Sequence, residues 1–125
     1  MVIKRGENMS VLFLQYPKCT TCKKAKKWLD DNNHSYEGRH IVEANPSVEE
    51  LTKWINESGL PVKRFFNTSG MLYREMNLKD KVKTASDEEL IELLATNGML
   101  VKRPLLITDK GIYPGFKEEE WEKLI

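Results

Sequence analysis

Two cysteines three residues apart, Cys19 and Cys22, are the residues whose types and spacing could do chemistry. They lie in the stretch YPKCTTCKKAKKWL, where an apolar run gives way to a lysine-rich one. Residues three apart on a helix share a face, and a disulfide needs Cα atoms about 4.4–6.8 Å apart. The pair could therefore be a redox couple, half of a metal site, or two ordinary buried thiols.

The predicted elements place this pair between a strand and a helix. The run SVLFLQY, residues 10–16, is rich in β-prone residues and ends at Pro17, which predicts a buried strand. Residues 19–32 are rich in Lys, Ala, Trp and Leu, which predicts a helix. One stripe of that helix carries the apolar residues Cys22, Ala25 and Leu29.

A cysteine that caps this helix would be the more reactive of the two. If Cys19 is the cap, its sulfur lies beside unpaired backbone N–H groups and the positive end of the helix dipole, which stabilise a thiolate. Lys18 and Lys23 act in the same direction. Cys22 lies one turn further in and is expected to be less exposed. This asymmetry predicts that Cys19 attacks and Cys22 resolves.

The alternatives for the cysteines have weaker support in the sequence. A zinc site needs four ligands, and the chain offers only His34 and His40 besides the two cysteines, with an awkward spacing. We therefore expect no metal and no organic cofactor. Two packed thiols without a redox function are the remaining alternative, and the spacing and the strand-to-helix junction favour the redox pair.

Further along the chain, two capping boxes predict two helices. The first helix is predicted to start at the box of Ser47 and Glu50 and to end at Gly59. The second is predicted to start at the box of Ser86 and Glu89 and to end at Gly98. The segment between them predicts short helices and loops. The aromatic residues of this segment and of the helix before it are more typical of a core than of a docking surface. They are Trp54, Phe65, Phe66 and Tyr73.

The remaining segments complete the order of elements. HSYEGRHIV weakly predicts a second strand, RPLLITD with KGIYPGF a hairpin, and KEEEWEKLI a closing helix. The order resembles the layout of a thioredoxin-like α/β domain, a mixed sheet flanked by helices, with a helical insertion before the final hairpin.

In such domains a cis proline at the start of the third strand faces the active cysteine, and Pro104 is the candidate. Arg103 would add a guanidinium that binds an oxyanion or stabilises a thiolate. The alternative is an edge-strand proline beside a surface arginine.

Composition limits the class of protein. A chain of 125 residues suits one domain, expected over residues 10–125 after a poorly ordered leader, residues 1–9, with Met9 as an alternative start. A net charge of +1 argues against direct nucleic-acid binding. No run reaches the roughly 20 apolar residues of a membrane helix, and the first residues do not read as a signal peptide. We expect a cytoplasmic monomer that does not bind membranes.

The chain resembles the arsenate reductase/Spx family, thioredoxin-fold proteins of the ArsC type, and is most similar to its YusI-like branch. The resemblance runs from Val11 to Ile125. The matching stretches are YPKCTTCKKAKKWL, GLPVKRFFNTSG, YREMNL, NGMLVKRPLLITD and GFKEEEW.

The resemblance implies a thiol-disulfide oxidoreductase with Cys19 as nucleophile, Cys22 as resolving residue, and Arg103 and Pro104 lining the site. Its substrate would be a thiol or disulfide, proteins included. A low-molecular-weight thiol or a thioredoxin-type partner would be the reductant.

True arsenate reduction is less favoured by the resemblance. The family's arsenate reductases surround the oxyanion with arginines, of which Arg103 matches one. The positions of the other two are occupied by Asn67 and Phe116. The Ser and Arg of the family's cysteine loop are replaced by Cys22 and Lys23.

A redox-sensing regulator of the Spx kind is the alternative from another functional class. Those regulators bind the C-terminal domain of the RNA polymerase α-subunit, and Gly59 could match a glycine of that surface. A plain helix C-cap also explains Gly59 and is the favoured interpretation. A basic residue that the regulators place on the preceding helix falls at Trp54.

Overall fold

The computed structural model describes residues 11–125, so the predicted leader at residues 1–9 lies outside the described residues. The chain divides into two compact units. The first contains the described residues up to His40 together with Arg103–Ile125, and the second is Ile41–Lys102. That residues 10–125 form one domain stays a prediction.

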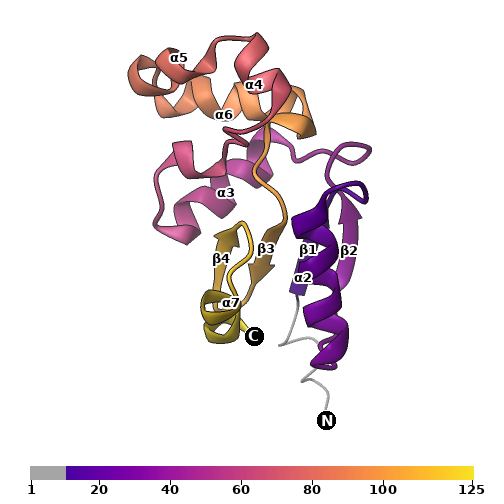
Figure 1. Ribbon diagram of the computed structural model, residues 1–125. Helices are drawn as coiled ribbons and strands as arrows, with labels where there is room; N and C mark the ends of the chain where they lie inside the picture. Colours follow the sequence, from indigo (N-terminus) through magenta and orange to yellow (C-terminus); the bar gives the residue numbers. More distant parts are fainter. Residues whose placement is uncertain (1–10) are drawn as a thin grey trace. The chain divides into compact units, whose positions relative to one another are not determined.

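The first unit is built on a four-stranded mixed sheet in the order β2-β1-β3-β4 (Figure 1). β2 is parallel to β1, whereas β3 is antiparallel to both β1 and β4. The bounds of the strands are Val11–Gln15 for β1, Glu37–His40 for β2, Leu105–Thr108 for β3 and Gly111–Pro114 for β4. Helix α2 (Thr20–Asp31) connects the parallel pair. The predicted thioredoxin-like α/β fold, including the hairpin, is confirmed.

Helix α2 and the closing helix α7 (Glu118–Leu124) form the core of this unit together with β1 and β3. On α2 the predicted stripe is buried: Cys22, Ala25 and Leu29 are each 0% exposed. On α7 Trp121 is fully buried, and its indole N–H donates to the carbonyl of Gly115 at 3.0 Å. The ring of Trp121 meets three other aromatic rings edge to face, those of Phe13, Trp28 and Phe116.

The second unit is helical, as the sequence predicts. Its helices are α3 (Val48–Ser58), η1 (Val62–Phe65), α4 (Met71–Glu75), α5 (Leu78–Thr84), α6 (Asp87–Thr96) and η2 (Gly98–Leu100). The aromatic residues expected in a core are buried: Trp54, Phe65, Phe66 and Tyr73. None of the helices in residues 11–125 has the length and apolar content that crossing a bilayer requires.

The predicted helix boundaries are confirmed at three of four ends. Ser47 and Glu50 form the reciprocal capping box of α3, which ends at Gly59 in the left-handed region with φ 71°. Ser86 accepts the Glu89 amide at the start of α6.

The predicted end of α6 at Gly98 is wrong by one residue, because Asn97 is the C-cap of the helix. The helix ends at Thr96 because Asn97 is extended and its side chain accepts the Met99 amide at 2.9 Å, which starts η2 instead.

Gly98 is fixed by a close backbone approach. A Cβ added there would overlap the carbonyl oxygen of Ile41, and its carbonyl carbon would lie 2.7 Å away. Backbone cannot swing aside as the end of a flexible side chain can.

We expect Gly98→Ala to lower the free energy of unfolding by about 3 kcal/mol, the upper end for overpacked sites, since a backbone segment must shift. Urea unfolding followed by circular dichroism measures this. Gly38→Ala is the matched control, because its Cβ would meet only a Tyr36 ring carbon at 4.0 Å. Equal stability of both variants and the wild type would contradict the contact.

Candidate thiol site

The sheet brings three distant segments together at the carboxyl end of β1. Cys19 follows the carboxyl end of β1 by four residues. Because β3 runs antiparallel to β1, with Leu14 opposite Leu105, the start of β3 with Arg103 and Pro104 lies beside the carboxyl end of β1. The parallel strand β2 ends there at His40, opposite Gln15.

Cys19 is the N-cap of α2, as the sequence predicts. Its backbone is extended (φ −86°, ψ 122°), and its sulfur accepts the amide N–H of Cys22 at 3.3 Å. Its own amide donates to the Tyr16 carbonyl at 2.9 Å. The side chain is partly exposed, and the first turn of α2 carries no acidic residue. The sulfur therefore lies at the positive end of the helix, where a negative charge is favoured.

Cys22 differs from Cys19 in both burial and ionisation. Both residues are free thiols, but Cys22 is 0% exposed. The pKa of the Cys22 thiol is raised to about 12, mainly by burial and also by the hydrogen bond to Cys19 and the Cys19 charge, while the Tyr16 backbone and Arg103 lower it. The Cys22 thiol thus keeps its proton at neutral pH and faces the Cys19 sulfur.

Pro104 is the cis proline predicted from the sequence. The Arg103–Pro104 peptide bond is cis, and Pro104 is buried. Its carbonyl accepts the Gly115 amide at 2.7 Å, which fixes the start of β3 against the residues that follow β4.

Tyr16 is a site residue that the sequence analysis does not identify. The Arg103 guanidinium carbon lies 5.2 Å from the centre of the Tyr16 ring, within the range of a cation–π contact. The other neighbour of the ring is His40, edge to face at 5.8 Å. Tyr16 therefore holds Arg103 beside the cysteine loop. The available signal was an aromatic residue directly before Pro17, at the carboxyl end of a predicted strand.

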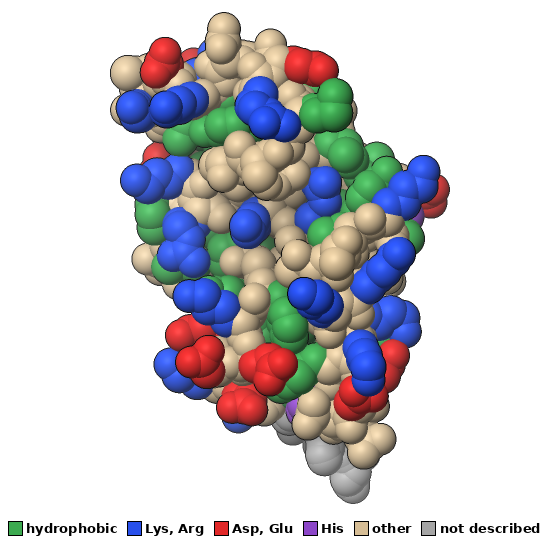
Figure 2. Space-filling model, viewed as in Figure 1, with side chains coloured by type: hydrophobic (Ala, Val, Ile, Leu, Met, Phe, Trp, Pro, Cys, Tyr) green, Lys and Arg blue, Asp and Glu red, His purple; other side chains and the backbone are tan. Residues whose placement is uncertain are grey.

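The charge around α2 is positive at its cysteine end. Figure 2 shows Lys and Arg side chains over α2, and Asp and Glu side chains over α7. Lys26 and Lys27 pair with Asp30 and Asp31 at 2.9 and 2.6 Å, near the other end of the helix. Lys23, directly after Cys22, has no such partner within the described part of the chain.

The structure also places the two residues that replace oxyanion arginines, Asn67 and Phe116, and the possible partner-binding residue Gly59. Phe116, at the position of an oxyanion arginine, packs its ring on Trp121 with centroids 4.9 Å apart. Asn67 and Gly59 belong to the helical unit. Over residues 11–125, no group of three or more His, Cys, Asp or Glu side chains is arranged to hold a metal ion.

Comparison with known sequences gives one family and several relatives. The sequence model of the ArsC family matches residues 14–124. The uncharacterised protein YusI of Bacillus subtilis (strain 168) is 51% identical over 115 residues, which cover 92% of this chain and 98% of that protein. The regulatory protein MgsR of the same strain is 30% identical over 112 residues, 90% of this chain and 87% of that protein.

A solved structure gives the same result. A protein related to the ArsC family from Bacteroides fragilis superposes with a TM-score of 0.90 at 61% identity, covering 94% of this chain and 99% of that one.

The raised pKa of Cys22 predicts a pH-dependent loss of stability in the reduced protein. The folded state keeps the Cys22 proton up to about pH 12, whereas the unfolded chain releases it near the ordinary value of 9.0. Stability from this group is therefore complete below about pH 9, and it falls by about 1.4 kcal/mol per pH unit as the pH rises toward 12.

Cys22→Ala removes this pH-dependent contribution to stability. We therefore expect the difference in free energy of unfolding between the wild type and this variant to shrink by about 1 kcal/mol between pH 9.5 and 10.5. Guanidinium unfolding at each pH, with a reductant present, measures the gap. Leu29→Ala is the control, since it truncates a buried residue of the same stripe that does not titrate. A gap that stays constant for both variants would contradict the assignment.

Proposed function

The chain belongs to the ArsC family, and from this premise we propose that it is a thiol-disulfide oxidoreductase whose redox pair is Cys19 and Cys22. The observation that carries the proposal is the asymmetry of the pair. One sulfur is partly exposed at a helix N-cap, where it accepts the backbone N–H of Cys22, and the other is buried one turn behind it.

In the first step, the Cys19 thiolate attacks one sulfur of a disulfide substrate. A bond forms between Cys19 and that sulfur, the substrate's S–S bond breaks, and the second substrate sulfur leaves as a thiolate that takes up a proton. The N-cap position places the attacking sulfur at the partly exposed start of α2, where it accepts the N–H of Cys22.

In the second step, Cys22 attacks the Cys19 sulfur of the mixed disulfide. Two of the influences that raise the pKa of Cys22 are the hydrogen bond to Cys19 and the charge of Cys19. Both are lost once the Cys19 sulfur is bonded to substrate, whereas the lowering effect of Arg103 persists. Cys22 therefore ionises more easily after the first step than before it. The bond between Cys19 and the substrate sulfur breaks, that sulfur leaves as a thiolate that takes up a proton, and a Cys19–Cys22 disulfide remains.

Two electrons from a thiol reductant return the pair to the reduced state. We assign this to a low-molecular-weight thiol or a thioredoxin-type protein, which a cytoplasmic location would supply. Pro104 would shape the backbone beside the pair, and Arg103, held by Tyr16, would supply positive charge to it.

The two cysteines predict different fates for their serine variants. We expect Cys19→Ser to reduce turnover of glutathione disulfide at least about 100-fold, since the nucleophile is gone. Cys22→Ser should instead accumulate a mixed disulfide on Cys19 that adds the mass of one glutathione.

Mass spectrometry of the intact protein and of its peptides measures this. The chain has only two cysteines, so the double serine variant is a complete blank. Equal turnover by both single variants and the wild type would contradict the roles, and so would a mixed disulfide mapped to Cys22.

Arsenate reduction is a less favoured activity for this site. The position of one oxyanion arginine is occupied by Phe116, whose ring belongs to the tryptophan cluster, and that of the other by the neutral Asn67. Each missing charge-assisted hydrogen bond costs the bound oxyanion about 1.5–3 kcal/mol.

A redox-sensing regulator is the second candidate. The relative MgsR, which is similar to this chain over 90% of its length, is named as a regulatory protein. Gly59 would be part of its contact with the RNA polymerase α C-terminal domain. A Cβ at Gly59 would have open space, with no atom within 4 Å, so the position leaves room for a partner. The buried Trp54 gives this surface no charge.

If the regulator reading is correct, the purified α C-terminal domain should bind the protein in one redox state, and Gly59→Arg should abolish binding. Gly59→Asn is the control, because Asn tolerates the left-handed backbone without adding charge or length. Fluorescence anisotropy with oxidised and reduced protein measures it. Absence of binding in both states removes this candidate and leaves the oxidoreductase.

A further inference from the structure

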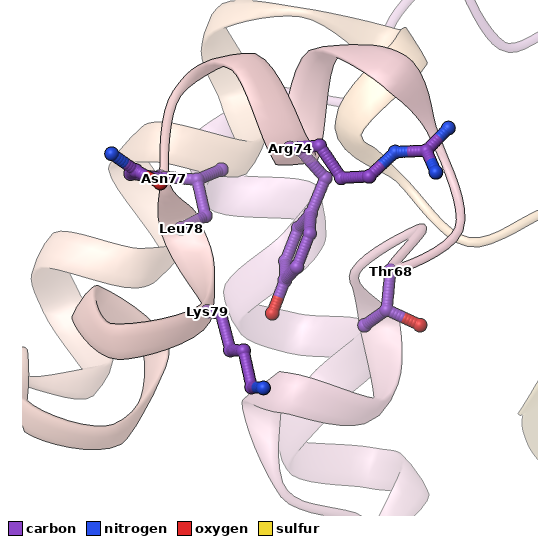
Figure 3. A pocket seen from close by; sticks show the side chains of 6 residues that line it. Thr68, Arg74, Asn77, Leu78 and Lys79 are labelled. Atoms are coloured by element: carbon purple, nitrogen blue, oxygen red, sulfur yellow. The ribbon is translucent and has the colours of Figure 1, made fainter.

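The helical unit contains a pocket of about 340 Å³ that lies entirely within residues 41–102. Residues from the turn after η1, from α4 and from the start of α5 line it: Thr68, Tyr73, Arg74, Asn77, Leu78 and Lys79. Figure 3 shows Arg74 and Thr68 on one side and Leu78 and Lys79 on the other. The volume is at the small end of the range for ligand sites.

Tyr73 carries a polar group without a partner in this lining. The residue is only 8% exposed, and its ring packs on Phe66 with centroids 6.0 Å apart. Within residues 11–125 its hydroxyl makes no hydrogen bond. Burial raises the pKa of this hydroxyl, which keeps it a hydrogen-bond donor. Tyr73 lines the pocket, so its hydroxyl is available to donate to a ligand group that accepts a hydrogen bond.

The charged residues of the lining are both cations. Neither Arg74 nor Lys79 has a carboxylate within ion-pair distance in the described part of the chain. The acidic residues next to them in sequence, Glu75 and Asp80, are not part of the lining. The described lining therefore carries two cations and no acidic side chain.

We propose that this pocket binds a small organic molecule that carries a phosphoryl group. Four side chains could donate to its three terminal oxygens: Arg74, Lys79, Tyr73 and Thr68. A planar carboxylate offers fewer acceptors. The buried Leu78 and the ring of Tyr73 provide an apolar wall for the organic part. The proposal does not depend on the chemistry of the cysteine pair.

Titration of the ¹⁵N-labelled full chain by NMR tests this, with phenyl phosphate as the probe. We expect saturable shifts of amide signals centred on residues 68–79. Phenol and benzoate should bind at least about tenfold more weakly, since each lacks the phosphoryl group. Inorganic phosphate tests whether the apolar wall contributes, and it too should bind more weakly than the ester.

Three variants identify the donors. Arg74→Gln and Lys79→Gln should each weaken phenyl phosphate binding about fivefold or more, and Tyr73→Phe, which keeps the ring, about threefold or more. Lys83→Gln is the matched control, because it removes an exposed lysine of α5 outside the lining. Each variant's spectrum shows whether it is folded.

Several outcomes would overturn the proposal. These are the absence of saturable shifts, shifts centred on the lysines of α2, equal binding of benzoate, or equal weakening by Lys83→Gln.

Discussion

The hydrogen bond from the Cys22 amide to the Cys19 sulfur, 3.3 Å long, is the contact on which the site depends. A sulfur that caps a helix must lie at the helix mouth, and a residue three positions later must lie one turn inside. The same geometry therefore exposes one thiol and buries the other among the stripe of α2. The different properties of the two sulfurs follow from their positions on one helix.

Local signals explain why much of the fold could be predicted. The spacing of Cys22, Ala25 and Leu29 gives the buried face of α2, and the box of Ser47 and Glu50 gives the start of α3. Each signal lies within one or two helical turns, so the sequence carries it directly. The prediction of a cis bond before Pro104 required the resemblance to thioredoxin-like domains, since proline allows the cis form but does not impose it.

Non-local contacts explain what could not be predicted. The stacking of Arg103 on Tyr16 depends on the pairing of β1 with β3, which joins distant parts of the chain. The close approach of Gly98 to Ile41 is a backbone contact that leaves no pattern of residue types. The pocket around Tyr73 gives no sequence signal either, because a buried tyrosine hydroxyl looks in sequence like any other.

The strand order makes β2 and β4 the two edge strands of the described sheet. Each is only four residues long; β2 carries Glu37 and Arg39, and β4 ends in a proline, which has no N–H. Short, charged or proline-bearing borders are poor templates for another chain's backbone. The sheet is thereby protected against the edge-to-edge aggregation to which exposed strands are prone.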